Sequence, residues 1–177
     1  CLQTLVVHHP ILRFGRDRFD HGNRLLKFDS RQQLPQPLRL VPVRKQKEKL
    51  IKNSPKVAIC KADFTVERDI NSVAAFIDRK FGTLDILIHC AGVLIMGAVG
   101  IAALDSLKLH LKVNYIAPYL ITQSLLPCLK KTQGQIVFIN TSAIHRAIPD
   151  LGQSSSSKFA LKGLADTLRE EVNSYGV

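Results

Sequence analysis

Two groups of polar side chains in this sequence are able to do chemistry, and they lie about a dozen residues apart. The hydroxyl pair Thr141-Ser142 follows a strand-like run at 135–140, and a serine run from Ser154 leads directly into Lys158. A hydroxyl group can polarise a carbonyl or take part in proton transfer, and a neighbouring ammonium can lower the pKa of an acid. The pattern therefore indicates proton-transfer chemistry between the end of a strand and the start of a helix.

The elements that must position these groups alternate between strand and helix. Apolar runs typical of strands occur at 38–43, 57–62, 84–89 and 135–140. Helical patterns cover 45–53, 66–81, 104–131 and 155–174, and we expect Pro118 and Pro127 to soften or kink the third of these helices. This alternation predicts an α/β fold, with a doubly wound parallel sheet and helices on both faces. Ligands of such sheets bind beyond the carboxyl ends of the strands.

The chain divides near residue 38. Residues 1–37 have no sustained helical or strand period, apart from a short strand-like run at 5–7. We therefore predict an irregular basic segment over 1–37 and a partial α/β domain over 38–177. Met96 is the only methionine, so we expect the chain to be a fragment or a truncated product.

Composition limits the class of protein. The 177 residues are 46% hydrophobic and 22% charged, which is enough for a globular core. The sequence has no run of 18 apolar residues, so a membrane span is not expected. The four cysteines have no Cys-x-x-Cys spacing, which favours reduced thiols and a cytoplasmic location. The histidines lack metal-ligand spacing, so no metal site is expected.

The net charge of +11 is concentrated at the start of the chain, because residues 1–53 hold twelve Lys/Arg and four Asp/Glu. Such a basic segment can follow the phosphates of a nucleic acid. No array of aromatic residues or nucleic-acid-binding motif accompanies it, so we do not expect nucleic-acid binding.

Four motifs, in order and spacing, resemble the short-chain dehydrogenases/reductases over residues 38–177. LDILIHCAG resembles the family's strand and Asn-Asn-Ala-Gly turn, with His89 and Cys90 in place of the two asparagines. KVNYIAPY, CKADFT and SSSSKFAL resemble its helix asparagine, its adenine-contacting aspartate and its Tyr-x-x-x-Lys helix. The resemblance implies a Rossmann-like fold, here truncated at both ends, and reversible hydride transfer between NAD or NADP and a small-molecule carbonyl or alcohol.

The resemblance also implies catalytic roles. Lys158 and Asn114 would belong to the proton relay, with Asn114 holding a water molecule, and Ser154 occupies the position of the family's tyrosine. Ser142 is our choice for the hydroxyl that polarises the carbonyl. The alanine that follows Ser142 favours this choice, whereas the thirteen-residue spacing to Ser154 favours Thr141, which stays open as the alternative.

Implied cofactor contacts are Asp63 at the adenine, Lys158, the turn Cys90-Ala91-Gly92, and Arg44, whose pairing with a 2′-phosphate would favour NADP over NAD. Structural alternatives stay open for several of these residues. Asp63 can instead initiate the turn or cap the helix that begins near Thr65, and Ala91-Gly92 can serve backbone turning alone. Arg44 can instead be a solvated residue at the start of a lysine-rich helix, and Asn114 can kink its own helix.

Two departures from the family pattern affect activity. The serine hydroxyl at Ser154 is a far weaker acid than a tyrosine, whose pKa is near 10, and losing general acid–base help costs about 10²–10⁴ in rate. Residues 1–37 contain only Gly15 and Gly22, so they lack the family's glycine-rich phosphate turn. We therefore predict an impaired oxidoreductase or, alternatively, a non-catalytic binding or interaction protein. A homo-oligomer could form through the helices.

Overall fold

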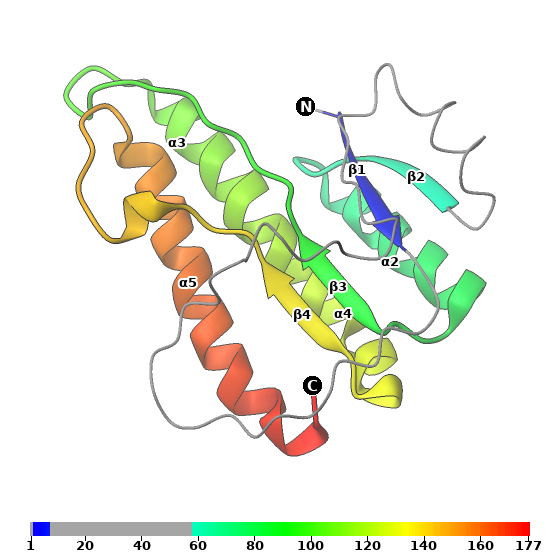
Figure 1. Ribbon diagram of the computed structural model, residues 1–177. Helices are drawn as coiled ribbons and strands as arrows, with labels where there is room; N and C mark the ends of the chain where they lie inside the picture. Colours follow the sequence, from blue (N-terminus) through cyan, green and yellow to red (C-terminus); the bar gives the residue numbers. More distant parts are fainter. Residues whose placement is uncertain (1, 8–57) are drawn as a thin grey trace, which may run out of the picture.

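The computed structural model of the chain describes residues 2–7 and 58–177 (Figure 1). Two pairs of strands are present in these residues: β1 (Leu2–Val7) with β2 (Ala58–Asp63), and β3 (Ile86–His89) with β4 (Gln135–Phe138). The helices are α2 (Glu67–Phe81), α3 (Leu104–Leu111), α4 (Ala117–Thr132) and α5 (Gly152–Val172). A π-helical turn (Lys112–Ile116) joins α3 to α4, and 3₁₀ turns occupy Ser142–Ile144 and Asn173–Tyr175.

The parallel pairing of β3 with β4 agrees with the predicted sheet. Ile86 lies opposite Gln135 and His89 opposite Phe138, so the two strands end together. By contrast, β1 pairs antiparallel with β2. Strand–helix alternation predicts a direction only for strands that a helix connects, so it could not predict this pairing. The elements expected at 38–43 and 45–53, and the boundary at residue 38, lie outside the described residues.

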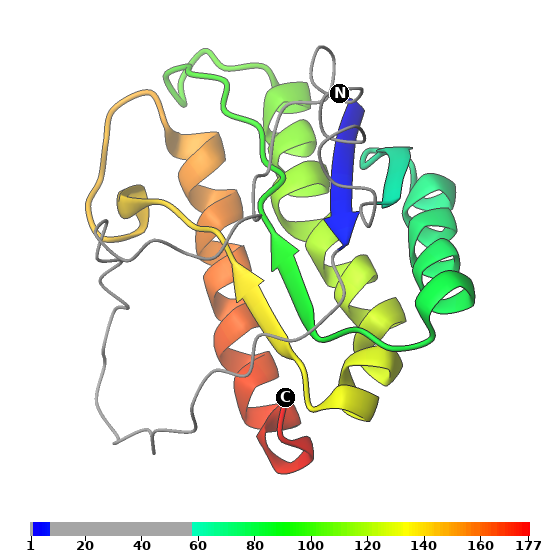
Figure 2. The ribbon, with the colours of Figure 1, turned by 45° about the vertical axis from the view of Figure 1, so that its right-hand side comes forward.

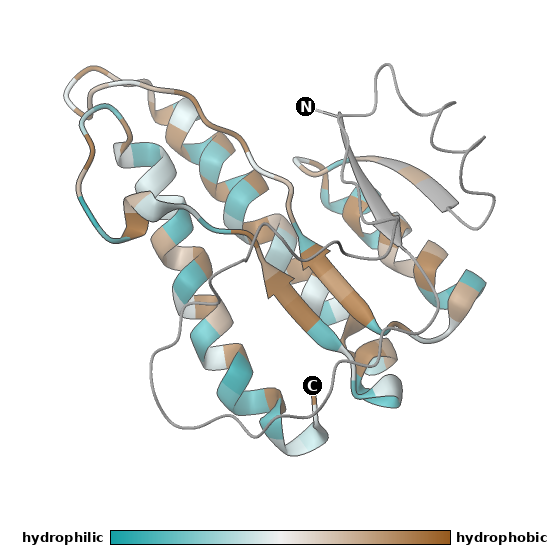
Figure 3. Ribbon diagram, viewed as in Figure 1, coloured by the Kyte–Doolittle hydropathy of each residue, from teal (hydrophilic) through white to brown (hydrophobic). Residues whose placement is uncertain are grey.

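The core forms where α2 and α4 pack against each other beside β3 (Figure 2). Figure 3 shows that β3 and β4 are apolar along most of their length, as expected for strands of a parallel sheet. Each large apolar side chain that is fully buried stabilises the fold by about 1.5–3 kcal/mol. The largest in this cluster are Ile70, Ile77, Leu84, Leu87, Ile121, Leu125 and Leu129.

The long helix predicted at 104–131 is present as α3, the π-helical turn and α4. Pro118 lies in the first turn of α4, and Pro127 lies inside that helix. The π-helical turn immediately precedes α4, and its residues Val113 and Asn114 are fully buried. A single π turn inside an α-helix is rare and often occurs at a functional site.

Helix α5 begins at Gly152, three residues before the predicted start at 155. The backbone N–H of Ser155 donates to the carbonyl of Leu151, and the Ser156 hydroxyl donates back to the carbonyl of Gly152. These bonds extend the helix through the serine run. Within the part of the chain that the structure describes, no helix is both long and apolar enough to cross a membrane.

His89, the last residue of β3, is buried in the core with 6% of its surface exposed. Its Nε2 lies 2.8 Å from Oγ1 of Thr122 in α4, and its ring stacks on Phe138 with the ring centres 4.8 Å apart. Burial lowers the pKa of His89 from 6.5 to about 4. This histidine therefore belongs to the core and is neutral near pH 7.

We predict that replacing Gly134, just before β4, by alanine destabilises the fold. A Cβ atom there would lie 2.7 Å from the carbonyl oxygens of Leu84 and Asp85. Gly134→Ala should lower the free energy of unfolding, measured in urea, by about 1–3 kcal/mol. Gly163→Ala is the matched control, because nothing lies within 4 Å of its Cβ position on α5, and it should raise stability by about 0.5–1 kcal/mol. Equal changes in the free energy of unfolding for the two substitutions would contradict the close contact expected at Gly134.

We also predict that His89 makes stability depend on pH. Because its folded pKa of about 4 lies below the unfolded value of 6.5, its contribution is complete above pH 6.5 and is lost as pH falls toward 4. The loss amounts to about 3 kcal/mol. His89→Asn should remove this part of the pH dependence in urea titrations between pH 4 and 7, because an asparagine does not titrate. An identical pH dependence in both proteins would refute the prediction.

Candidate active site

The candidate active site lies where β3 and β4 end side by side (Figure 1). The turn Cys90-Ala91-Gly92 follows β3, and Thr141-Ser142 follows β4. The π-helical turn and the first turns of α5 pack against each other beside these strand ends. The parallel topology therefore brings three of the motifs found in the sequence to one edge of the sheet.

Asn114, in the π-helical turn, connects the turn after β3 to α5. Its Oδ1 accepts a hydrogen bond from the backbone N–H of Val93 at 2.8 Å. Its Nδ2 donates to the carbonyl of Val93 at 3.1 Å and to the Ser157 hydroxyl at 3.0 Å. Asn114 thus lies in the site as expected, although its role of holding a relay water stays a prediction.

Lys158 lies in α5 with its ammonium group directed to the end of β4. Its Nζ donates to the carbonyl of Ile139 at 2.9 Å. Burial lowers the pKa of Lys158, and the nearby thiol of Cys90 opposes part of this shift. A Cβ atom on Gly92 would lie 3.4 Å from Asn114 Oδ1 and 3.8 Å from Lys158 Nζ. Glycine therefore keeps open the space that these two polar groups border.

The hydroxyl groups of the site have different surroundings. Thr141 is half-buried, and its Oγ1 accepts from the N–H of Ala143 at 3.3 Å, so it caps the 3₁₀ turn, whereas Ser142 is exposed. Ser154 is 7% exposed, and its backbone carbonyl accepts a hydrogen bond from the Ser157 hydroxyl at 2.7 Å. The choice of Ser142 over Thr141 stays a prediction.

Asp63 ends β2 and shapes the turn into α2. Its Oδ1 accepts from the N–H and the hydroxyl of Thr65 at 2.9 and 2.8 Å, and these bonds lower the pKa of the carboxyl. The N-cap residue of α2 is Val66, so Asp63 stabilises the preceding turn and is not itself the cap. The cofactor contacts of Asp63 and of Arg44, which lies outside the described residues, stay predictions.

The sequence interpretation missed three polar residues that hold the site together. Ser157 bonds Asn114, and Asn140 bonds both the N–H of Thr141 and the carbonyl of Lys158. His110 is fully buried and accepts from the N–H of Ile95 at 3.1 Å, which anchors the loop after β3. The signals available were the position of Asn140 directly before the hydroxyl pair and that of Ser157 directly before the lysine.

One buried polar atom near the site has no partner. Gln153 is 6% exposed, and its Oε1 makes no hydrogen bond within the described part of the chain. Across residues 58–177 and the short strand at 2–7, no group of three or more His, Cys, Asp or Glu side chains could hold a metal ion.

Solved structures resemble the described fold. A short-chain dehydrogenase from Streptomyces avermitilis has a TM-score of 0.67 at 24% identity, covering 73% of this chain and 48% of that chain. Sorbitol-6-phosphate 2-dehydrogenase from Erwinia amylovora has a TM-score of 0.61 at 26% identity, covering 65% and 46%. These similarities confirm the predicted Rossmann-like α/β fold.

Sequence comparisons support the same family. A 3-dehydrosphinganine reductase of Danio rerio and a 3-ketodihydrosphingosine reductase of Mus musculus are each 30% identical over 143 residues, which are 78% of this chain and 43% of either relative. The chain thus spans less than half the length of these relatives. The family model described as short chain dehydrogenase matches residues 38–177. The chain belongs to the short-chain dehydrogenase/reductase family, whose members are oxidoreductases that generally use NAD or NADP.

Proposed function

We propose that this chain is an NAD(P)-dependent oxidoreductase that acts on a small carbonyl or alcohol compound, with its proton-transfer step impaired. The observation that carries the proposal is the meeting of Gly92, Asn114 and Lys158 at the ends of β3 and β4. The names of the two reductase relatives favour a keto compound as the substrate.

The residues at this edge fit a bound dinucleotide. The missing side chain of Gly92 leaves space beside the Lys158 ammonium, and Cys90 and Ala91 belong to the same turn. An ammonium has three N–H donors, and the carbonyl of Ile139 takes one, which leaves two for ligand oxygens. When bound, the dinucleotide supplies or accepts the hydride. We propose NADP rather than NAD because Arg44 follows the first predicted strand of the family domain.

The protein's own residues would assist transfer of the proton and stabilise the negative charge that develops on the substrate oxygen. Lys158, held at the strand end, would stabilise negative charge that develops on an adjacent oxygen. A hydroxyl from Ser142 or Thr141 would donate a hydrogen bond to the carbonyl oxygen of the substrate. Ser154, in the tyrosine position, cannot serve as an effective acid near neutral pH, because its hydroxyl is far less acidic than a phenol.

A second candidate function is that of a non-catalytic binding protein. The loss of the phenol at Ser154 favours it. The described residues keep the shape of the site through Asn114 and Ser157, which do not depend on a phenol. The two functions share the dinucleotide site and differ only in turnover.

We also propose that copies of the chain associate through α4 and α5. Together with the π-helical turn, these helices border a surface groove whose lining includes Tyr115, Tyr119 and Leu164. Tyr119 is 43% exposed, which leaves an aromatic side chain available for a partner helix.

We predict that Ser154→Tyr raises the rate of NADPH-dependent reduction of a keto compound by about 10²–10⁴, because it restores an acid beside Lys158. Binding of NADPH and NADH is first measured by fluorescence titration of the purified chain. Turnover is then followed by the loss of NADPH absorbance.

Ser154→Tyr with Lys158→Met is the control, and it should lose the gain. Detectable binding with no gain from Ser154→Tyr would favour the non-catalytic candidate. No binding of either dinucleotide at millimolar concentration would reject the site for both functions.

A further inference from the structure

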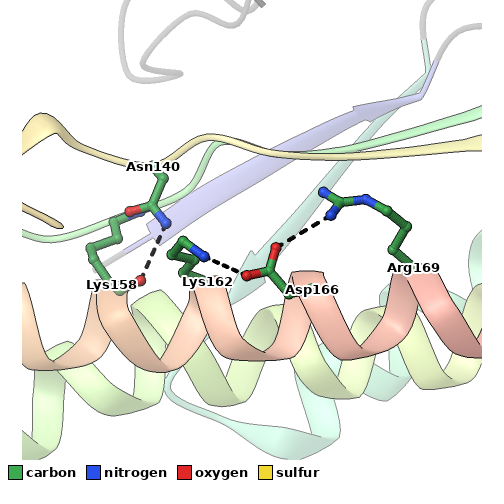
Figure 4. Close-up of polar contacts among 5 residues, drawn as sticks. All are labelled: Asn140, Lys158, Lys162, Asp166 and Arg169. Atoms are coloured by element: carbon green, nitrogen blue, oxygen red, sulfur yellow. Dashed lines mark hydrogen bonds and ion pairs between the residues drawn. The ribbon is translucent and has the colours of Figure 1, made fainter. Parts of the chain in front are cut away.

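Two reciprocal hydrogen bonds join the end of β4 to α5. The Asn140 side chain donates from Nδ2 to the backbone carbonyl of Lys158 at 3.2 Å (Figure 4). In the opposite direction, Lys158 donates from Nζ to the carbonyl of Ile139 at 2.9 Å. Lys158 is therefore fixed at both its backbone end and its ammonium end by two consecutive residues of one segment.

The other end of the Asn140 amide holds the hydroxyl segment. Its Oδ1 accepts from the backbone N–H of Thr141 at 2.9 Å. Because a carbonyl oxygen has two lone pairs, the Lys158 carbonyl can accept from Asn140 and still serve the helix ladder of α5. One amide thus sets the position of the segment that carries Thr141-Ser142 relative to the turn that carries Lys158.

This arrangement orders the Lys158 side chain, whose ordering costs conformational entropy. A free lysine has many rotamers, and fixing them on ligand binding reduces affinity. The two hydrogen bonds that join Lys158 to Ile139 and Asn140, here called the clamp, restrict Lys158 before any ligand arrives and direct its ammonium to the space beside Gly92.

The next lysine along α5 is kept apart from this clamp. Lys162 lies one turn after Lys158, where like charges repel each other. Figure 4 shows Lys162 paired with Asp166, which also contacts Arg169. Lys162 is therefore engaged by its own helix, whereas the Lys158 ammonium is bonded to the carbonyl of Ile139 at the end of β4.

We propose that Asn140 is a positioning residue for Lys158, which holds the lysine ammonium in the geometry that a bound dinucleotide requires. The role toward a bound dinucleotide rests on the function proposed above. The positioning of Lys158 by Asn140 does not, so the two can be tested separately.

The first experiment measures Lys158 without any ligand. Each lysine is acylated at graded pH and quantified by mass spectrometry, in the unchanged chain and in Asn140→Ala. Releasing Lys158 to water should move its labelling midpoint upward, toward that of an ordinary lysine, and increase its labelling rate.

Thr132→Val is the matched control for the labelling. It also removes a hydrogen bond between a side chain and another element's backbone, from Oγ1 to the Leu84 carbonyl at 2.6 Å, but far along α4 from the site. It should leave the Lys158 midpoint unchanged. Circular dichroism verifies that each variant is folded. An unchanged Lys158 midpoint in folded Asn140→Ala overturns the inference.

The second experiment is a double-mutant cycle on NADPH affinity, with Asn140→Ala, Lys158→Met and the pair. Asn140→Ala should weaken binding about three- to tenfold, as for the loss of one hydrogen bond, and should have no effect once Lys158 is methionine. Equal weakening in both backgrounds would assign Asn140 a general structural role and reject the positioning role. If the unchanged chain binds no NADPH, the proposed function fails, and the labelling alone decides the role of Asn140.

Discussion

The buried amide of Asn114 is the interaction on which the candidate site depends. Asn114 is fully buried, and its donors and acceptor are matched only when the turn after β3 and helix α5 are both docked. A buried polar group without a partner costs about 1–3 kcal/mol. The amide therefore favours one arrangement of these segments over any alternative in which the turn or the helix is displaced. The π-helical turn belongs to the same arrangement, since Asn114 lies within it.

Most of the fold could be predicted because it follows from local pattern. Apolar runs and helical periodicity indicated β2, β3, β4 and the helices from α2 to α5, and the parallel direction of β3 and β4 followed from the helices between them. Several boundaries could not be predicted, because contacts between distant or neighbouring backbone groups decide them. Backbone bonding at Leu151, for example, begins α5 at Gly152, three residues before the predicted start.

The meeting of three motif residues at one sheet edge could be predicted, but the hydrogen bonds that connect them could not. Parallel topology explains why Gly92, Asn114 and Lys158 meet, since segments after neighbouring parallel strands share one edge of the sheet. The bonds from Asn140 and Ser157 cross between elements, and neither periodicity nor spacing within one element specifies them. His89 shows the opposite case, in which a position assigned to a cofactor-lining motif contributes a neutral side chain to the core.

The hydrogen bonds around position 154 do not require a tyrosine, whereas effective proton transfer in the reaction does. Ser154 accepts the Ser157 hydroxyl through its backbone carbonyl, which every amino acid supplies. Ser157 in turn accepts from Asn114, so the chain of bonds from α5 to the turn after β3 needs no phenol. Lys158 is held by Ile139 and Asn140, again independently of residue 154. A serine in place of the tyrosine at this position therefore removes an acid while the surrounding residues keep their hydrogen bonds.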